Sequence, residues 1–455
     1  MDTNLQIHNT HQTNSADYFG EHDPQLQRLA QFPYRYTFPL LHQLPDTLAG
    51  IYTIGGGRQI GKTTLVKQWM LHLLKNKQVD PQQVFFLTGD IIDIYHQLIE
   101  KITQLLADKI PGEIFYLAVD EITYIKDWDR GIKFLADAGL LDSVVLLLTG
   151  SDLVMMQEAR MRFPGRRGSA DQVDFQLYPL SFAQYLKLFN AFDDIDLSIQ
   201  NITLSPAHWA TLETHFSHYL QHGGYLTAIN DISRFGEIQR ATLQTYSDWI
   251  RGDCLKRGKQ EQYLKEILSA VIKHQGSQMT WHTIAKTLSI DHHKTVGDYL
   301  TLLENMGAIH IQYALLEDKR APAPKKARKL YFSDPFVYHA IKAWLSPSSA
   351  PMIQINQDIS SPELSSLLVE TAVLGHFKRH HPTFYLKGQG DVDIAYLAQD
   401  QFWPIELKWR NQIRPGDLKQ LAKYPNGRLW TKGHTYGEIN GIPVEPLLLA
   451  LVCMG

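Results

Sequence analysis

The feature that most constrains this chain is the run Gly56-Gly57-Arg58-Gln59-Ile60-Gly61-Lys62-Thr63, which matches the pattern G-x-x-x-x-G-K-[ST]. The β-branched segment 50–54 precedes it, and residues 63–76 follow with the apolar spacing of a helix. A glycine-rich turn between a strand and a helix lets successive backbone N–H groups approach an anion, and the positive end of the helix faces it. The pattern therefore predicts a loop that wraps the phosphates of a nucleotide.

The residues of this loop have separate expected roles. Lys62 is expected to pair with the β- and γ-phosphates, and the Thr63 hydroxyl to bind Mg²⁺. The nucleotide is expected to contact Gly56, Gly57, Arg58, Gln59, Ile60, Gly61, Lys62, Thr63 and Thr64. Guanine recognition by an N-K-x-D motif has no support, because Asp80 follows Asn76-Lys77 one residue too late. The predicted ligand is therefore ATP with Mg²⁺.

Two acids and a hydroxyl complete the predicted site. The apolar segment 114–119 ends in Asp120 and Glu121, and the apolar segment 143–149 runs into Thr149-Gly150-Ser151. Asp120 is expected in the Mg²⁺ shell, and Glu121 as the base that polarises an attacking water. We choose Ser151 as the hydroxyl that bonds this water or the γ-phosphate. Together these residues predict an ATPase.

The segments around these motifs alternate between strand and helix. Strands are expected at residues 50–54, 83–87, 114–119 and 143–149, and helices at residues 63–76, 91–106 and 128–138. Strands that are apolar throughout indicate a parallel sheet covered on both faces. We therefore predict an α/β, doubly wound P-loop NTPase domain over residues 26–190. A disordered polar tail is expected over residues 1–25.

Length and charge limit the other possibilities. A chain of 455 residues is expected to form two to four domains. A formal net charge of −3 excludes a uniformly basic surface, so any nucleic-acid contact must come from a local patch. The distant Cys254 and Cys453 indicate neither a disulfide framework nor a cysteine-based zinc site. Without a signal peptide or a long apolar run, the chain is expected in the cytoplasm with no membrane partner.

Residues 261–345 have the pattern of a winged helix, after a helical extension over residues 191–260. Helices are expected at residues 261–274, 280–288 and 291–306, with strands at 308–315 and 329–332. Double-stranded DNA would be contacted by the start of the third helix and by a proline-spaced basic loop. These residues are His292, His293, Lys294 and Thr295 on the helix, and Lys319, Arg320, Lys325, Lys326, Arg328 and Lys329 in the loop. The alternative is a protein–protein adaptor whose exposed loop is cationic.

After a predicted linker over residues 346–362, residues 363–455 are expected to form a separate α/β domain. Glu370, Asp393, Glu406 and Lys408 have the order of a PD-(D/E)xK nuclease core. Strand alternation points Glu406 and Lys408 to one face, where carboxylates could hold Mg²⁺ while the lysine orients water. A domain that keeps this fold and binds without cutting is the alternative. The apolar run 446–452 has the length of a buried strand.

The chain resembles the prokaryotic AAA-type ATPases that carry a C-terminal DUF4143 domain, from about Leu26 to the C-terminus. The residues that carry the resemblance are the P-loop, Asp120-Glu121-Ile122, Asp127-Trp128, Thr149-Gly150-Ser151, Gly165-Arg166-Arg167, Tyr178-Pro179-Leu180-Ser181-Phe182, Gly223-Gly224-Tyr225 and Lys329-Leu330-Tyr331-Phe332-Ser333-Asp334. The resemblance implies an ATPase core, a winged helix and a nuclease-like fold. Arg166 is our choice for an arginine finger that reaches a γ-phosphate in a neighbouring subunit, and Arg160, Arg162 and Arg167 compete with it.

Two departures from the family pattern are visible. Gly57 stands where the family often has proline, and Gly223-Gly224 continues as Tyr-Leu instead of Tyr-Pro. Three functions follow from the whole sequence. The first is an ATPase that uses nucleotide to drive or gate DNA engagement. The others are a metal-dependent nuclease regulated by ATP and a nucleotide-sensing adaptor that binds a protein partner and has no nucleic-acid role. The chain is expected to act as a homo-oligomer or with a protein partner.

Overall fold

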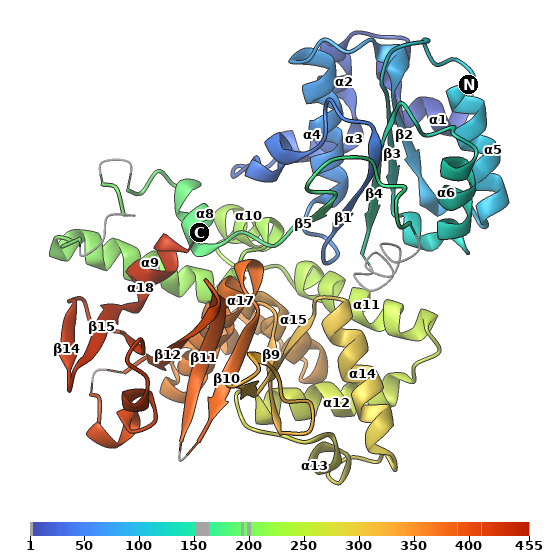
Figure 1. The fold of residues 1–455 in the computed structure, drawn as a ribbon. Helices are drawn as coiled ribbons and strands as arrows, with labels where there is room; N and C mark the ends of the chain where they lie inside the picture. The colour runs from blue at the N-terminus through green and yellow to red at the C-terminus, as the bar shows by residue number, and fades with distance from the viewer. Residues whose placement is uncertain are drawn as a thin grey trace. The chain divides into compact units, whose positions relative to one another are not determined.

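The computed structural model describes residues 3–151, 163–192, 195–197, 202–388, 390–410 and 412–454. The chain divides into two compact units, Met1–Tyr178 and Pro179–Gly455 (Figure 1). The first boundary thus falls twelve residues or so before the predicted one at residue 190, and helix α8 (Phe182–Lys187) belongs to the second unit. The helical extension, the winged-helix segment and the C-terminal segment lie together in that second unit.

The first unit is built on the predicted parallel sheet. Its described strands follow the order β2-β3-β4-β1-β5, and each neighbouring pair is parallel. The strands are β1 (Gly50–Gly55), β2 (Val84–Thr88), β3 (Phe115–Asp120), β4 (Val144–Gly150) and β5 (Asp174–Gln176). Nearly every residue of β1 to β4 is buried, because helices cover both faces. The expected α/β P-loop fold is confirmed, and only the short β5 was not predicted.

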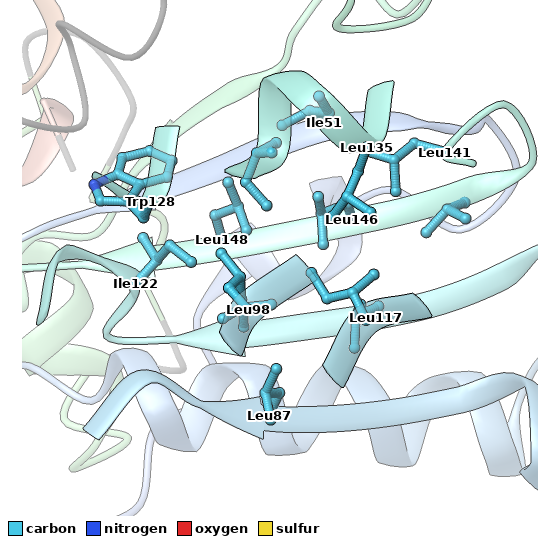
Figure 2. Close-up of a cluster of buried hydrophobic side chains, with 14 of the residues drawn as sticks. Ile51, Leu87, Leu98, Leu117, Ile122, Trp128, Leu135, Leu141, Leu146 and Leu148 are labelled. Atoms are coloured by element: carbon cyan, nitrogen blue, oxygen red, sulfur yellow. The ribbon is translucent and has the colours of Figure 1, made fainter. Parts of the chain in front are cut away.

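Two helices cover one face of this sheet. They are α5 (Tyr95–Leu106) and α6 (Trp128–Asp137), whose Leu98, Trp128 and Leu135 are buried against the strands. Figure 2 shows these side chains facing Leu117 and Leu146, which come from the neighbouring strands β3 and β4. Alternate residues of each strand point into this cluster, so the core fixes the register of the sheet.

The P-loop helix α4 (Lys62–Lys75) covers the opposite face (Figure 1). Its Trp69 is fully buried, lies 6.1 Å from the ring of Tyr116 and donates a 3.0 Å hydrogen bond to the carbonyl of Pro45. The short helices α2 (Ala16–His22) and α3 (Pro24–Ala30) pack on the outer side of α4. This packing fixes the middle of α4 against β3.

The predicted disordered tail over residues 1–25 is wrong for the described part. Helix α1 (Thr3–His8), α2 and the start of α3 form an N-terminal arm, residues 3–25, that closes the β2 edge. The Asn9 amide donates to the Phe86 carbonyl at 2.8 Å and accepts from the Phe86 N–H at 2.7 Å, as a neighbouring strand would. Phe19 and His11 are buried beneath the arm. Polar composition misled the prediction because polar side chains here satisfy the backbone of an edge strand.

The first half of the second unit is helical. The helices are α8 (Phe182–Lys187), α9 (Pro206–His222), α10 (Leu226–Phe235), α11 (Arg240–Lys256), α12 (Glu261–His274), α13 (Trp281–Ala285) and α14 (His293–Asn305). Strand β6 (Ile309–Tyr313) then pairs antiparallel with β9 (Arg328–Phe332). Between them, β7 (Leu315–Leu316) and β8 (Ala321–Pro322) form a small antiparallel hairpin. Three helices followed by this ladder agree with the element order that we expected.

The predicted linker over residues 346–362 contains a helix. After α15 (Pro335–Leu345), helix α16 (Pro351–Ser360) precedes α17 (Pro362–His380). Asp358 of α16 is buried and forms an ion pair with Lys342 of α15 at 2.6 Å. This pair and the buried Ile355 fix the segment against its neighbours, which its content of serine and proline did not indicate.

A mixed sheet forms the C-terminal part of the second unit. Its described strands follow the order β10-β11-β12-β13-β15-β14. They are β10 (Thr383–Lys387), β11 (Asp391–Ala398), β12 (Gln401–Lys408), β13 (Arg428–Thr431), β14 (Gly437–Ile439) and β15 (Ile442–Pro446). The run 446–452, which has the length of a strand, is instead the helix α18 (Leu447–Cys453).

The ladder of β6 and β9 packs against this sheet. The Gln312 amide donates to the carbonyls of Phe384 at 3.0 Å and Asp393 at 2.8 Å, and Leu315 lies in one buried cluster with Leu386. The winged-helix segment and the C-terminal segment therefore share a core and are not separate domains. Among the described residues, no helix is both long and apolar enough to cross a membrane.

Candidate functional site

The predicted phosphate loop lies between the end of β1 and the start of α4. Gly61 caps α4 with a φ of +96°, a left-handed conformation that glycine adopts without strain. Gly56 has a φ of +156°, and a Cβ there would lie 2.5 Å from the Ile60 side chain and 2.7 Å from the Leu177 carbonyl oxygen. Both positions therefore require glycine. The first N–H groups of α4 have no acceptor within their helix, and they point into the loop.

Lys62 is the buried cation of this loop. Its Nζ donates to the carbonyls of Gly56 at 3.1 Å and Gly57 at 2.8 Å, and it lies 3.9 Å from the Glu121 carboxylate. The side chain is therefore curled into the loop, with its charge at the place where phosphate oxygens are expected.

Asp120 is held by two hydroxyls at the carboxyl end of β3. Thr63, at the start of α4, donates to one oxygen of Asp120 at 2.7 Å, and Thr149, at the end of β4, donates to the other. The Thr149 hydroxyl also accepts from the Glu121 N–H at 3.0 Å. The predicted pair Thr63 and Asp120 is thus brought together, and Thr149 links it to Glu121. We did not predict the role of Thr149, although parallel strands that end at one edge are the signal for it.

Glu121 sits in a left-handed conformation, with a φ of +51°, where β3 turns into a short helical segment. Such backbone strain in a residue other than glycine is typical of functional sites. Its carboxylate accepts from Ser151 at 3.3 Å and faces Lys62. Burial raises the pKa of this carboxyl, Lys62 lowers it and Asp120 raises it, so that the net shift is upward. The structure therefore places Glu121 and Ser151 together, as the sequence predicted.

These residues fit Mg²⁺ and a nucleoside triphosphate. Magnesium in such sites takes one or two protein oxygens and completes its shell with phosphate oxygens and water. Thr63 and Asp120 supply a hydroxyl and a carboxylate oxygen within one hydrogen bond of each other. Among the described residues there is no cluster of three or more acidic, histidine or cysteine ligands that could hold a metal alone. A site completed by phosphates is consistent with that finding.

The predicted arginine finger has a partner in this structure. The Arg166 guanidinium forms an ion pair with Asp137 at the end of α6 and donates to the Pro164 carbonyl at 3.1 Å. Arg167 pairs with Asp174 at 2.7 Å and is a structural residue of the sheet. The competing Arg160 and Arg162 lie outside the described residues. Arg58, within the loop, bonds the hydroxyl of Tyr124.

Most of the residues predicted to contact DNA are exposed, and two of them interact with other protein groups instead. The exposed ones are His292, His293, Lys294, Lys319, Arg320, Lys325 and Lys326, and Thr295 is half-buried. Arg328 stacks on the rings of Trp281 at 4.4 Å and Tyr313 at 5.3 Å. The prediction for Lys329 is wrong: it is 4% exposed and forms ion pairs with Asp391 and Asp393, so it is not free to contact a phosphate.

The predicted nuclease-like residues do converge on one partly buried cluster. The Leu407 N–H donates to Asp393 at 3.0 Å, and Lys408 pairs with Glu406 on β12. Burial and then Asp393 raise the pKa of both Glu370 and Glu406. We call Glu370, Asp391, Asp393 and Glu406 the carboxylate cluster. Despite this convergence, its members are not arranged as ligands of one metal ion in the part of the chain that is described.

The parallel sheet, the glycine loop and the acids at the end of β3 define a P-loop NTPase domain. In agreement, residues 49–186 match the family model of the AAA domain. A second model, a domain of unknown function named DUF8612, matches residues 213–348. The expected DUF4143 is not found; the matched domain is a different one and ends before the C-terminal sheet. No curated protein matches the chain.

Several solved structures resemble the chain weakly. The Walker-type ATPase of Pyrococcus abyssi is 13% identical, with 64% of this chain and 91% of that chain covered and a TM-score of 0.43. The ORC1 protein of Aeropyrum pernix, solved in complex with DNA, is 13% identical, with 72% and 92% covered and a TM-score of 0.33. RuvB of Thermotoga maritima is 13% identical, with 57% and 81% covered and a TM-score of 0.28. Likenesses this weak carry no functional argument.

Proposed function

We propose that the first unit binds ATP with Mg²⁺ and hydrolyses it. The observation that carries this proposal is the meeting of four residues at one edge of the sheet. Lys62 and Thr63 open α4, and Asp120 and Glu121 close β3, with 2.7 Å between Thr63 and Asp120 and 3.9 Å between Lys62 and Glu121. A cation, a hydroxyl and two acids beside a ring of backbone N–H groups are what phosphoryl transfer to water requires.

In this proposal each side chain has one task. The loop N–H groups and Lys62 bind and orient the phosphates, and Thr63 with Asp120 holds the metal shell. When bound, Mg²⁺ neutralises charge that develops on the phosphate oxygens. Glu121 takes a proton from the attacking water, and its raised pKa brings it closer to the pH at which a general base is most effective. Ser151 orients the Glu121 carboxylate through its 3.3 Å bond.

The substitution Glu121→Gln tests the proposed base. Hydrolysis should fall by about 10²- to 10⁴-fold, because the amide cannot accept the proton, while ATP binding is retained. The exposed Glu113, in the loop before β3, provides the matched control Glu113→Gln. A Glu121→Gln variant that hydrolyses ATP at the rate of the control would show that Glu121 is not the base.

We further propose that the second unit engages duplex DNA and that nucleotide controls this engagement. The order α12-α13-α14 followed by the β6–β9 ladder supports a winged-helix interpretation. Exposed cations lie at the start of α14 and along the loop between β6 and β9, including Lys294, Lys325 and Lys326. The positive charge of this loop is partly offset between β7 and β8, because Glu317 and Asp318 adjoin Lys319 and Arg320 there. Arg166 remains a candidate finger for a neighbouring copy of the chain.

DNA affinity as a function of salt tests this second part. The double substitution Lys325→Ala and Lys326→Ala should weaken binding and flatten the salt dependence by about one unit for each phosphate that the variant no longer neutralises. The double substitution Lys256→Ala and Lys273→Ala, at exposed positions on α11 and α12, is the control. ATP should change the affinity if the units are coupled. Binding that does not depend on salt, or no binding with or without ATP, would favour the adaptor.

A metal-dependent nuclease is the second candidate. The meeting of Glu370, Asp393, Glu406 and Lys408 supports it, whereas the arrangement of the described cluster does not fit a metal ion. Plasmid degradation that disappears in Asp393→Ala would establish it.

A further inference from the structure

We propose that Lys329 is the resident cation of the carboxylate cluster, so that the cluster takes its positive charge from the chain and not from a divalent metal ion. The inference concerns the second unit alone and does not depend on ATP hydrolysis. It follows from where Lys329 lies, from the donors that the carboxylates already have, and from the two ammonium groups that the chain places beside them.

Lys329 reaches the cluster from outside the C-terminal sheet. It belongs to β9, which pairs with β6, and its Nζ lies 3.5 Å from Asp391 and 3.7 Å from Asp393 of β11. The side chain is almost fully buried and passes the Tyr385 ring, whose centroid is 5.3 Å from Nζ. A buried ammonium between two carboxylates occupies the position that a metal ion bound by those carboxylates would need.

The carboxylate oxygens also have donors from the protein. The Gln278 amide donates to both oxygens of Asp391, at 2.6 and 2.8 Å. The Tyr331 hydroxyl donates to Glu370 at 3.1 Å, and the Leu407 N–H to Asp393 at 3.0 Å. Oxygens that already accept protein hydrogen bonds have fewer lone pairs for a metal, and exchanging these donors for a metal would leave buried donors unsatisfied. Protein donors therefore already bond both oxygens of Asp391 and one oxygen each of Glu370 and Asp393.

The chain itself supplies positive charge to the cluster. Lys329 and Lys408 bring two ammonium groups to its four carboxyl groups. One oxygen of Glu406 pairs with Lys408, and the other is buried without a hydrogen-bond partner in the described structure. Two ammonium groups of the chain therefore face the carboxyl groups that a divalent metal ion would otherwise neutralise.

The ion pairs of Lys329 join two segments of the second unit. Lys329 lies on β9, and its partners Asp391 and Asp393 lie on β11, so residues of the nuclease-like cluster connect the β6–β9 ladder to the C-terminal sheet. Removing one partner of such a pair leaves the other charge buried and uncompensated, whereas replacing both partners is much less costly. The pair is therefore expected to behave as a unit in a double-mutant cycle.

Manganese binding to the full-length, nucleotide-free chain tests the proposal, with free Mn²⁺ followed by electron paramagnetic resonance. All proteins carry Thr63→Ala, which removes the proposed metal ligand of the P-loop. We expect the parent chain to bind no Mn²⁺ at the cluster. Lys329→Met should gain a site, because the carboxylates lose their cation, and adding Glu406→Gln to Lys329→Met should remove that site.

Two results would overturn the proposal. One is Mn²⁺ binding by the parent chain that Glu406→Gln abolishes, and the other is a folded Lys329→Met protein that binds none. Should Lys329→Met fail to fold, the comparison of the parent with Glu406→Gln decides the question alone. Thermal unfolding adds a second readout: Lys329→Met should lower Tm, and the double variant Lys329→Met with Asp393→Asn should recover part of that decrease. No recovery would contradict a paired charge.

Discussion

At the scale of single residues, the nucleotide site depends on one hydroxyl to which we assign no chemical step. Thr149 donates to Asp120 and accepts from the Glu121 N–H at 3.0 Å. It therefore fixes the metal-shell acid and the backbone of the base at once. Thr149 is a positioning residue, and its substitution should affect turnover more than nucleotide binding.

The substitution Thr149→Val removes the hydroxyl with little change of shape. Asp120 loses a donor and the Glu121 N–H loses its acceptor, and a buried polar group left unpaired costs roughly 1–3 kcal/mol. We expect kcat to fall by about 10- to 100-fold while KM for ATP changes little, since about 1.4 kcal/mol corresponds to a factor of ten. Steady-state hydrolysis measures both constants, and Thr149→Ser should recover most of the rate. A rise in KM alone would contradict a positioning role.

The roles of residues in short sequence motifs could be predicted. The roles of residues whose partners are distant in the sequence could not. Lys62 and Thr63 follow from the loop pattern, and Asp120 and Glu121 from a strand that ends in acids. Lys329 was predicted to be a cation of the basic loop, because no residue near it in the sequence indicates that Asp391 and Asp393 are its partners. Its burial is decided by partners that are distant in the sequence.

At the scale of elements, the N-terminal arm replaces a strand at the β2 edge. Asn9 uses its side-chain amide as a peptide group, with bonds of 2.8 and 2.7 Å to the backbone of Phe86. The buried Lys67 of α4 adds an ion pair with Asp23 at 3.2 Å and a hydrogen bond to the His8 carbonyl at 2.8 Å. The arm therefore contacts the helix that begins at the P-loop, although it is remote from that loop in sequence.

The substitution Asn9→Ala tests this edge contact. Both backbone groups of Phe86 lose their partner, so the free energy of unfolding of the first unit should fall by roughly 1–3 kcal/mol. Urea unfolding of the full chain measures the change, and the exposed Asn14, substituted to alanine, is the control within the same arm. Equal stabilities of the two variants would show that the arm does not contribute to the edge.

Acid should loosen the same arm. Burial lowers the pKa of His11 to about 4, even though a hydrogen bond to the Val84 carbonyl opposes that shift. The unfolded arm takes a proton near the ordinary pKa of 6.5, before the folded arm does, so its stability falls as pH drops from 6.5 toward 4. Burial and then Lys67 also lower the pKa of His8, which adds in the same direction.

Hydrogen exchange of the arm measures this effect after correction for the intrinsic pH dependence of exchange. Protection of α1 to α3 should decrease on going from about pH 7 to about pH 5, and His11→Gln should reduce the decrease, because one of the two titrating groups is removed. Protection that is the same at both pH values in the wild-type chain would contradict a buried neutral histidine.

Element types were predictable where apolar spacing was long and regular. The four main strands of the first unit and the helices between them lie within a few residues of their expected bounds, and α12 (Glu261–His274) coincides with its prediction. For short apolar runs, the sequence could not distinguish a strand from a helix. Residues 143–149 form β4, whereas the similar run 446–452 forms α18. The arm and α16 were missed because their order comes from tertiary contacts and not from composition.

At the scale of the whole molecule, the chain has a first unit that holds most of the AAA-domain match and a second unit that contains three predicted segments. The family resemblance predicted the AAA-domain match in the first part of the chain. For the second unit it predicted DUF4143, whereas residues 213–348 match DUF8612. Sequence order alone could not show that Gln312 bonds the backbone of β10 and β11, which merges the ladder with the C-terminal sheet. The proposed ATPase function belongs to the first unit.

The binding of Mg²⁺–ATP by the purified full chain tests this proposed function most directly, and thermal unfolding measures that binding. At about 100 times Kd, ATP with Mg²⁺ should add roughly 2.7 kcal/mol to the free energy of unfolding of the first unit and raise Tm by several degrees. Lys62→Ala should show no such rise, because its loop lacks the cation. A wild-type Tm that ATP does not move at any Mg²⁺ concentration, or an equal rise in Lys62→Ala, would contradict the proposed nucleotide site.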